Sequence, residues 1–550
     1  MINTPAIGKV TATENKPTSC NNVRFWLHKD VVLRPFDIVR IKHIPLRNGE
    51  EASYSYALVQ DLQYMTDSAG HLANYVSSDF GDLAAEPINE RLGTTVAEAE
   101  VLFNTKDIEM PVRDGAAVEW ADKDGIKEAL GLNQLRHPIP AGYISMSNNE
   151  EVPIEFDAAY LVGPEGAHLN IAGISGLATK TSYAMFLLSS IQQRMRDKAA
   201  FIIFNVKGKD LLSIDKPNES LASTKTEWSK CGLEPIPFRD VTYLYPYDNK
   251  ADRNFTNSHV DPDILRDQIE RNIAFNYFYD VENGKEKIPL LFSDVDDPNS
   301  TLEAIFHQIV EDIEADDWNS LRNQVRERTD KGHTKSKEIP VVSWRKFSRL
   351  LWTRTKDHSL FTNRSDTKDR RHMLTRDAVI NLRPGKVLVI DIEPLPDYLQ
   401  CLVVGDVIQT VLGVKLGDAD IEPEELGTVV IFADELNKYG PKSPGSADRS
   451  LTRSLLEITE RGRSLGLVLF GAEQFRSGVH DRILGNCSTN VFGRTSPVEI
   501  SKSQDYRYFP DVYKSAITRL PQGTLLLQHP IFKTSLLKAR FPSPCYYQPK

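Results

Sequence analysis

The stretch "GISGLATKTS" at residues 173–182 combines small residues, a lysine and hydroxyl side chains in the order that phosphate-binding loops use. The usual pattern is G-x-x-x-x-G-K-[ST], in which backbone N–H groups cradle phosphates and the lysine reaches the terminal phosphates. Here Gly173 opens the loop and Lys180 and Thr181 close it, but the loop is one residue longer and Thr179 replaces the second glycine. A small-residue turn that packs a helix against a sheet explains the stretch equally well.

The flanking residues place this stretch between a strand and a helix. "LNIA" before Gly173 is apolar, and "TSYAMFLLSSIQQRMRDK" from Thr181 onward has the spacing of an amphipathic helix. Backbone N–H groups at a helix N-terminus attract anions. We therefore predict that the loop binds nucleotide phosphates through Gly173, Ser175, Gly176, Leu177, Ala178, Thr179, Lys180, Thr181 and Ser182.

A second motif, "VVIFADEL" at residues 429–436, ends an apolar run in two acids, Asp434 and Glu435. Such a run is typical of a buried parallel strand, and α/β proteins bind ligands at the carboxyl ends of these strands. Asp434 is suited to hold Mg²⁺ together with Thr181, and Glu435 to polarise an attacking water. A solvated acidic turn explains this motif alone equally well, but the two motifs together favour a nucleotide site.

Two further polar residues follow apolar runs. "LFGAEQF" ends at Gln474, which could sense the terminal phosphate or position water, although a polar cap on a strand is the more common reason for such a residue. "NVKGKDLL" at residues 205–212 contains Asp210, which could assist near the phosphates. Neither residue would define a site by itself.

The elements that position these residues change along the chain. Short β-branched and aromatic segments up to about residue 105, such as "FDIVRIKHI" and "YSYALVQDLQYM", predict a small antiparallel barrel. "LNIA", the helix after it and "AAFIIFNV" predict a parallel βαβ unit. From about residue 215 to 380 the spacing of apolar residues is helical, and strands return with "GKVLVIDIEPL". We expect a barrel domain at 1–160, an ATPase core at 161–215 and 381–530, a helical insertion at 216–380 and a tail at 531–550.

The segment "RGRSLGLVLFGAEQFRSGVHDRILGNCSTNVFGRTSP" at 461–497 resembles the HerA/FtsK branch of hexameric P-loop ATPases. "GKVLVIDIEPL" and the helix after it are similar to the same family, as is a small barrel before "HLNIAGISG". The resemblance is most specific over 387–530. The loop departs from the family pattern, because Ala178 and Thr179 replace the usual glycine and the spacing is expanded.

The resemblance implies an α/β fold with a RecA-like P-loop ATPase core, an N-terminal antiparallel HAS-type β-barrel and a helical insertion. It also implies roles for single residues: Lys180 and Thr181 as the Walker A pair, Asp434 and Glu435 as the Walker B pair, and Gln474 as the sensor glutamine. Arg461 or Arg463 would act on the γ-phosphate of a neighbouring subunit. Without the resemblance, these two arginines fit a salt-bridged helix end, since Glu457 and Glu460 are close in sequence.

The function implied by the resemblance is ATP hydrolysis with Mg²⁺ by a ring, expected to be a hexamer, that translocates or remodels duplex DNA in the manner of a translocase or helicase. Relatives act beside a nuclease or a Sir2-type NAD-consuming effector, which suggests anti-phage defence. The alternative is a nucleotide-binding scaffold ring that organises an effector with little motor activity: the altered loop favours it and the Asp434–Glu435 pair opposes it. A conjugation-type coupling ATPase is disfavoured because no membrane segment is evident.

Composition sets wider limits. The 550 residues carry a formal net charge of −10, which argues against a protein that coats nucleic acid with its whole surface. Residues 322–376 nevertheless hold 16 Lys and Arg against 6 Asp and Glu, which indicates either a solvated helical face or a nucleic-acid surface. The five cysteines lie far apart without a C-x-x-C pair, which argues against zinc and fits a reducing cytosol. No apolar signal segment is evident, so we expect a cytoplasmic protein without membrane contact.

Overall fold

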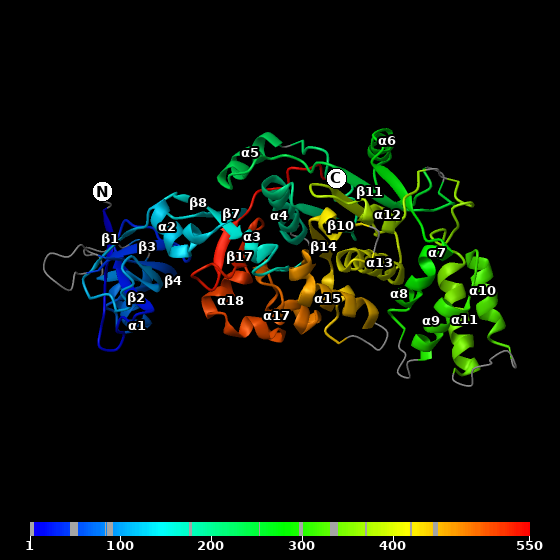
Figure 1. Ribbon diagram of the computed structural model, residues 1–550. Helices are drawn as coiled ribbons and strands as arrows, with labels where there is room; N and C mark the ends of the chain where they lie inside the picture. Colours follow the sequence, from blue (N-terminus) through cyan, green and yellow to red (C-terminus); the bar gives the residue numbers. More distant parts are fainter. Residues whose placement is uncertain are drawn as a thin grey trace.

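The computed structural model contains a closed β-barrel followed by a large mixed sheet with helices on both of its faces (Figure 1). It describes the following residues: 5–43, 53–82, 84, 92–174, 179–219, 221–251, 254–295, 301–330, 339–368, 371–418, 421–443 and 449–549. The barrel lies at one end of the molecule, and the N-terminus lies beside it.

The barrel has six antiparallel strands in the order β1-β2-β5-β4-β3-β6, which confirms the predicted N-terminal barrel. Side chains that alternate along each strand point inward and form a separate apolar core. The helix α1 (His71–Ser77) lies in the connection between β4 and β5, and α2 (Lys123–Leu130) follows the barrel. The strands are β1 (Ala6–Val10), β2 (Asn22–Leu27), β3 (Ile38–Lys42), β4 (Tyr54–Thr66), β5 (Gly93–Asn104) and β6 (Ala117–Trp120).

The large sheet has twelve strands in the order β12-β11-β13-β10-β14-β15-β9-β16-β17-β18-β7-β8. Neighbours from β12 to β16 are parallel, and neighbours from β16 to β8 are antiparallel. The strands are β7 (Pro138–Ser145), β8 (Glu151–Asp157), β9 (Leu169–Ala172), β10 (Ala199–Asn205), β11 (Val241–Pro246), β12 (Ala274–Tyr277), β13 (Val387–Asp391), β14 (Thr428–Asp434), β15 (Leu467–Glu473), β16 (Thr489–Phe492), β17 (Thr524–Gln528) and β18 (Leu537–Arg540). With β15 between β9 and β14, the parallel part is the predicted RecA-like core.

The parallel strands are mostly apolar and almost entirely buried because both faces of the sheet are covered. One face packs against α4 (Thr179–Met195), α5 (Leu221–Lys230) and α6 (Pro262–Glu270). The other packs against α13 (Asp397–Leu416) and α15 (Arg449–Leu465). Shorter helices complete the two layers: α3 (Ala158–Leu161), α12 (Thr375–Ile380), α14 (Leu436–Tyr439), α16 (Asp481–Gly485), α17 (Pro497–Lys502) and α18 (Asp511–Ile517).

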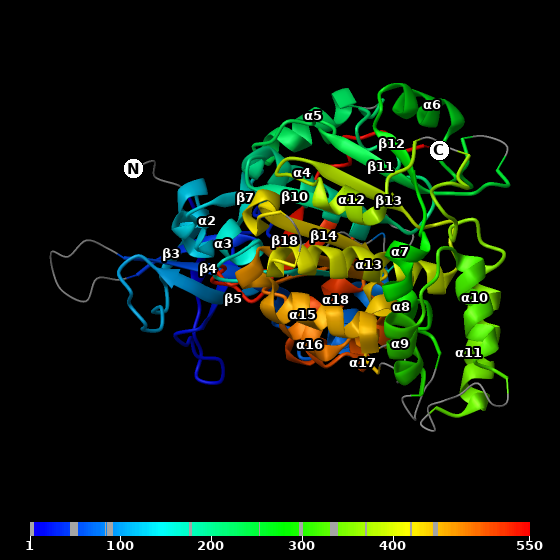
Figure 2. The same cartoon turned by 45° about the vertical axis from the view of Figure 1, so that its right-hand side comes forward.

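A group of helices extends from the sheet at the end away from the barrel (Figure 2). Its apolar side chains join the core on the α13 face of the sheet. The helices are α7 (Val281–Gly284), α8 (Ile288–Leu291), α9 (Thr301–Asp312), α10 (Trp318–Glu327) and α11 (Val341–Thr355).

The large sheet contains five strands that lie outside the predicted bounds of the ATPase core. Residues 216–380 were expected to be helical, but β11 and β12 lie in this range and extend the sheet beside β13. Strands β7 and β8, expected in the barrel domain, and β18, expected in the tail, also pair into this sheet. Pairing between strands that are distant in the chain cannot be recognised from the sequence of either strand alone.

The sequence showed no evident membrane segment, but helix α13 has the length and apolar composition of one. Within the described residues it is long and apolar enough to cross a membrane by length and composition, but 78% of its most apolar window is buried inside the protein. The apolar character is explained by packing, because α13 is the central helix of one face of the sheet.

Candidate functional site

The strand β9 ends at the root of the predicted phosphate loop, at the carboxyl edge of the parallel sheet. The Gly173 N–H donates to the Glu473 carbonyl over 3.2 Å, and the Ile174 N–H donates to the Arg494 carbonyl over 2.8 Å. A Cβ on Gly173 would lie 3.3 Å from Gly493 Cα, so glycine suits this close approach. The loop therefore leaves the sheet between β15 and β16. Of the predicted loop residues, Ser175, Gly176, Leu177 and Ala178 lie outside the described residues.

The other predicted loop residues form the first turn of α4: Thr179, Lys180, Thr181 and Ser182. The first N–H groups of a helix have no partner within the helix, and the helix dipole makes this end positive. No acidic residue occupies the first turn. Lys180 is only 6% exposed, and burial lowers its pKa although Asp434 opposes the change. The N-terminus of α4 and Lys180 together therefore form a buried, positively charged site that suits an anion.

Asp434, the last residue of β14, meets α4 across the sheet edge. The Thr181 hydroxyl donates to Asp434 Oδ2 over 3.1 Å, and Asp434 is 5% exposed. A hydroxyl and a carboxylate are oxygen ligands of the kind that Mg²⁺ takes beside phosphates and water. Among the described residues no cluster of three His, Cys, Asp or Glu could hold a metal. A cation here would therefore complete its shell with ligand or water oxygens.

Glu435 follows Asp434 in an unusual backbone conformation, with φ 58° and ψ 44°. A non-glycine residue in this left-handed region costs about 1–3 kcal/mol, and such strain clusters at functional sites. The Glu435 N–H donates to Asp434 Oδ1 over 2.8 Å, and its carboxylate forms an ion pair with Lys207. Lys207 was not among the predicted site residues, although it lies in the same "NVKGKDLL" segment as Asp210.

Lys180, Thr181, Lys207 and Asp434 line a cavity of about 270 Å³. Asp210 is part of its wall, and burial raises the pKa of this carboxyl. Tyr546 and Gln548 also line it, so the expected tail contributes to the site; the Tyr547 N–H holds this segment by donating to the Lys216 carbonyl over 2.8 Å. The lining residues are Ile174, Thr179, Lys180, Thr181, Ser182, Asn205, Val206, Lys207, Asp210, Leu211, Asp434, Tyr546 and Gln548.

Five of the predicted residues that the structure describes do not line this cavity: Gly173, Glu435, Gln474, Arg461 and Arg463. Gln474 is exposed and directly follows β15, which lies between β9 and β14. Arg461 pairs with Glu457 over 2.9 Å, and Arg463 Nη1 donates to the Glu165 carbonyl over 3.2 Å. Since α15 ends just before β15 begins, both arginines lie at the amino edge of the sheet, opposite the phosphate loop. They cannot reach the cavity of their own chain from there.

A buried acid beside the site was also missed. Asp391 ends β13, accepts a hydrogen bond of 2.8 Å from Asn205 Nδ2, and accepts another from the Ser258 hydroxyl. Burial raises its pKa to about 6, against the effect of these hydrogen bonds. Its signal in the sequence was the acid at the end of the apolar run "VLVID", the same signal that marked Asp434.

No protein-family profile and no curated protein matches the chain. Among solved structures, the plasmid coupling protein TrwB in complex with the non-hydrolysable GTP analogue GDPNP is 13% identical, with 70% of this chain and 87% of that chain covered and a TM-score of 0.40. VirB4 of Thermoanaerobacter pseudethanolicus is 11% identical, with coverage of 74% and 96% and a TM-score of 0.43. The genome packaging NTPase B204 from Sulfolobus turreted icosahedral virus 2, in complex with ATP-gammaS, is 15% identical, with coverage of 30% and 71% and a TM-score of 0.22.

Proposed function

We propose that this chain is an ATPase that hydrolyses ATP with Mg²⁺ at the carboxyl edge of its parallel sheet. The observation that carries the proposal is the meeting of Lys180, Thr181 and Asp434, from motifs about 250 residues apart, around one cavity, with a hydrogen bond between Thr181 and Asp434. If residues 173–182 were only a packing turn and residues 429–436 only a solvated acidic turn, their polar side chains would not be expected to meet.

Each residue of the site has a task that follows from its place. Lys180 and the N-terminal N–H groups of α4 bind the terminal phosphates. Thr181 and Asp434 hold Mg²⁺, which neutralises phosphate charge when bound. Glu435 orients and deprotonates the attacking water once its carboxylate is released from Lys207. Gln474, at the end of the strand between the two motifs, senses the γ-phosphate.

The active form that we propose is a homo-oligomeric ring, a hexamer, as in the HerA-like family. Arg461 and Arg463 lie at the opposite edge of the sheet from the phosphate loop, so either can contribute to catalysis only in the site of a neighbouring subunit. A trans arginine would stabilise the charge that develops in phosphoryl transfer.

We propose duplex DNA as the polymer on which the ring acts. Support comes from a hollow of about 350 Å³ between α10 and α11, in whose wall the described residues include no acid. Arg326, Arg345 and Arg349 line it, all three are exposed, and none forms an ion pair with a described residue. Unpaired guanidinium groups suit phosphate oxygens, whose recognition is independent of base sequence.

The remaining parts of the proposal rest on the family resemblance alone. The barrel would serve ring assembly or docking of an effector such as a nuclease or a Sir2-type NADase. The setting would be the cytoplasm, and the role anti-phage defence.

ATP turnover by the purified full chain, with and without duplex DNA, tests the proposal. We expect turnover that DNA stimulates and that Glu435→Gln abolishes while nucleotide binding persists. If no condition gives turnover, including addition of the effector, the proposed ATPase is wrong.

The alternative is a scaffold ring that binds nucleotide without motor action. The ion pair between Glu435 and Lys207 favours it, as does the absence of Glu435 and Gln474 from the cavity wall. Nucleotide-dependent assembly of a chain that does not hydrolyse ATP would establish this alternative.

A further inference from the structure

The turn after β15 has exposed residues at its tip and buried ionisable side chains at its two ends. Gln474 and Phe475 are exposed, whereas Glu473 is 0% and Arg476 5% exposed. Charged side chains are almost never fully buried unless they are paired, because desolvation is costly. Glu473 and Arg476, whose burial is therefore unfavourable unless they are paired, flank Gln474, the residue proposed to sense the γ-phosphate.

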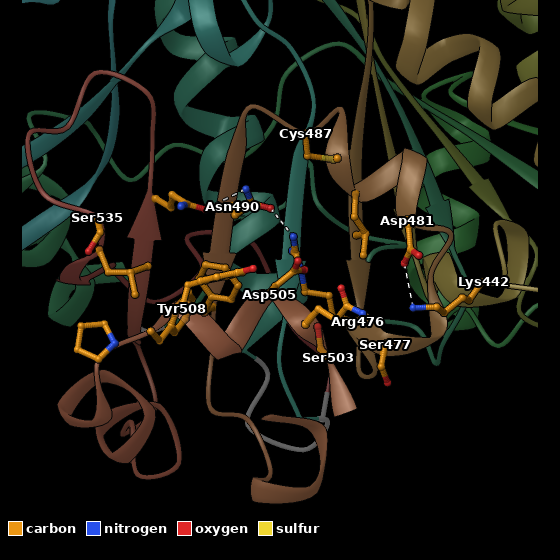
Figure 3. Close-up of a pocket in the computed structure, with 18 residues that line it drawn as sticks. Lys442, Arg476, Ser477, Asp481, Cys487, Asn490, Ser503, Asp505, Tyr508 and Ser535 are labelled. Carbon is orange, nitrogen blue, oxygen red and sulfur yellow. Dashed lines mark hydrogen bonds and ion pairs between the residues drawn. The ribbon is translucent and has the colours of Figure 1, made fainter. Parts of the chain in front are cut away.

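Arg476 connects three separate elements. Its guanidinium donates to Asn490 of β16 over 3.0 Å, to Asn170 of β9, and to Asp505 of the 3-10 helix η6 (Gln504–Tyr508). It also lies over the ring of Phe492, 5.4 Å from its centre. Figure 3 shows the side chains of Arg476, Asn490 and Asp505 close together in the wall of a pocket, which has a volume of about 550 Å³. The guanidinium thus fixes the turn relative to β9, β16 and η6 at once.

Glu473 connects the same turn to the phosphate loop. Its Oε2 accepts a hydrogen bond of 2.9 Å from Asn170 Nδ2, and its backbone carbonyl accepts the hydrogen bond from Gly173. Burial raises the pKa of this carboxyl to about 8, although Arg476 and Lys180 act in the opposite direction. Asn170 therefore bridges the two side chains and lies three residues before the loop begins.

A second attachment holds the turn from its other flank. The Ser477 N–H donates to Glu499 Oε1 over 2.7 Å, and the Ser477 hydroxyl donates to Glu499 Oε2 over 2.8 Å. Glu499 belongs to α17 and is 3% exposed. The tip residues Gln474 and Phe475 are thus held by buried polar contacts on both sides.

We propose that Glu473 and Arg476 are positioning residues that hold Gln474 in register with the phosphate loop, so that turnover depends on them more than nucleotide binding does. The inference rests on the ATPase function proposed above. Its physical basis is that phosphoryl transfer depends on placement: a displacement of about 1 Å can cost about a hundredfold in rate. The loop root and the sensor turn share Asn170, so a shift of the turn changes the distance between Gln474 and the phosphates.

The test compares Arg476→Met, Glu473→Gln and the double variant in the full chain. We expect Arg476→Met to lower kcat for ATP by about tenfold or more, because the turn loses its attachment to Asn170, Asn490 and Asp505. The Kd for an ATP analogue should change by less than about threefold, since Lys180, Thr181 and Asp434 are untouched.

The double variant separates positioning from stability. Arg476→Met alone leaves the buried Asn170 side-chain carbonyl oxygen without its donor and should lower Tm. Glu473→Gln together with Arg476→Met removes both buried ionisable groups, so Tm should recover toward the wild-type value while kcat stays low. Recovery of kcat together with Tm would show a purely structural pair and overturn the inference.

The matched control is Asp481→Asn, which breaks the 3.0 Å ion pair with Lys442 on another wall of the same pocket and should leave kcat unchanged. An equal loss of kcat in this control would also overturn the inference. Wild-type turnover with unchanged kcat in Arg476→Met would overturn the positioning role alone, whereas absence of wild-type turnover would overturn the proposed ATPase and the inference with it.

Discussion

The Thr181 hydroxyl donates a hydrogen bond to Asp434 Oδ2 over 3.1 Å and thereby joins the first turn of α4 to the end of β14. The two residues are 253 positions apart in the chain. Because β15 separates β9 from β14 in the sheet, this contact exists only when the three strands are aligned at their carboxyl ends. A Mg²⁺ ion that binds a nucleotide here would take its protein contacts from this pair.

Thr181→Val should therefore abolish the Mg²⁺ dependence of nucleotide binding. Valine keeps the shape of threonine without its hydroxyl, so we expect affinity for a fluorescent ATP analogue in Mg²⁺ to fall by about tenfold or more. Thr181→Ser keeps the hydroxyl and should bind within about threefold of wild type. Titrations in Mg²⁺ and in EDTA check the prediction; a Thr181→Val protein that still responds fully to Mg²⁺ contradicts it.

Lys180→Met should raise the Tm of the nucleotide-free protein and abolish the further rise on adding nucleotide. Burial lowers the pKa of Lys180, which means that the folded state disfavours its charge, and its ammonium has no hydrogen bond to a described residue. Lys415→Met is the matched control: burial also lowers the pKa of Lys415, but its ammonium donates to the carbonyls of Pro423, over 2.9 Å, and Gly427. This variant should lower Tm, because two carbonyls lose their donor.

Thermal unfolding of both variants with and without an ATP analogue makes the comparison. A Lys180→Met protein less stable than wild type without nucleotide would show that its ammonium already has a stabilising partner.

The sequence predicted the parts of the site that depend on local pattern. The apolar runs that end at Ala172 and at Asp434 are buried strands, and a helix begins beside Lys180, because burial on both faces leaves a continuous apolar run and a helix leaves its own period. The antiparallel barrel and the RecA-like order of the core are confirmed for the same reason.

Features that depend on pairing between distant segments could not be predicted. Strand β18 and the cavity residues Tyr546 and Gln548 lie in the segment predicted to be a tail. They could not be assigned to the sheet and the site because the residues they contact are far away in the sequence. Glu473 is similar: it stands in an apolar strand, and its burial makes sense only beside Asn170 and Arg476. No spacing rule relates these residues.

Arg349→Glu should weaken binding of duplex DNA and reduce its salt dependence. The Arg349 side chain lines the hollow between α10 and α11 beside Arg326 and Arg345, so a carboxylate there would repel phosphates. We expect affinity at low salt to fall by about tenfold and the salt slope to fall by about one. Arg266→Glu on α6 makes the same change of charge on a side chain that is 65% exposed and should have little effect. Equal losses in both variants would mean that only net charge matters, which contradicts a DNA contact in the hollow.

His529→Gln should reduce the acid sensitivity of the fold. His529 is 3% exposed, accepts a hydrogen bond of 3.0 Å from the Asp157 N–H, and has its pKa lowered to about 3 by burial. Below about pH 6.5 the unfolded chain binds a proton that the folded chain excludes, so stability falls as pH falls from about 6.5 toward about 3. Glutamine can accept the same hydrogen bond without titrating, so the loss of Tm between pH 7.5 and pH 5 should be smaller in this variant. Some loss of Tm remains because the pKa of buried His168 is also lowered, to about 4.

The control is His307→Gln, on a side chain that is 71% exposed, which should leave the loss of Tm unchanged. A His529→Gln protein that loses as much Tm as wild type over this range would show that another group dominates the acid response.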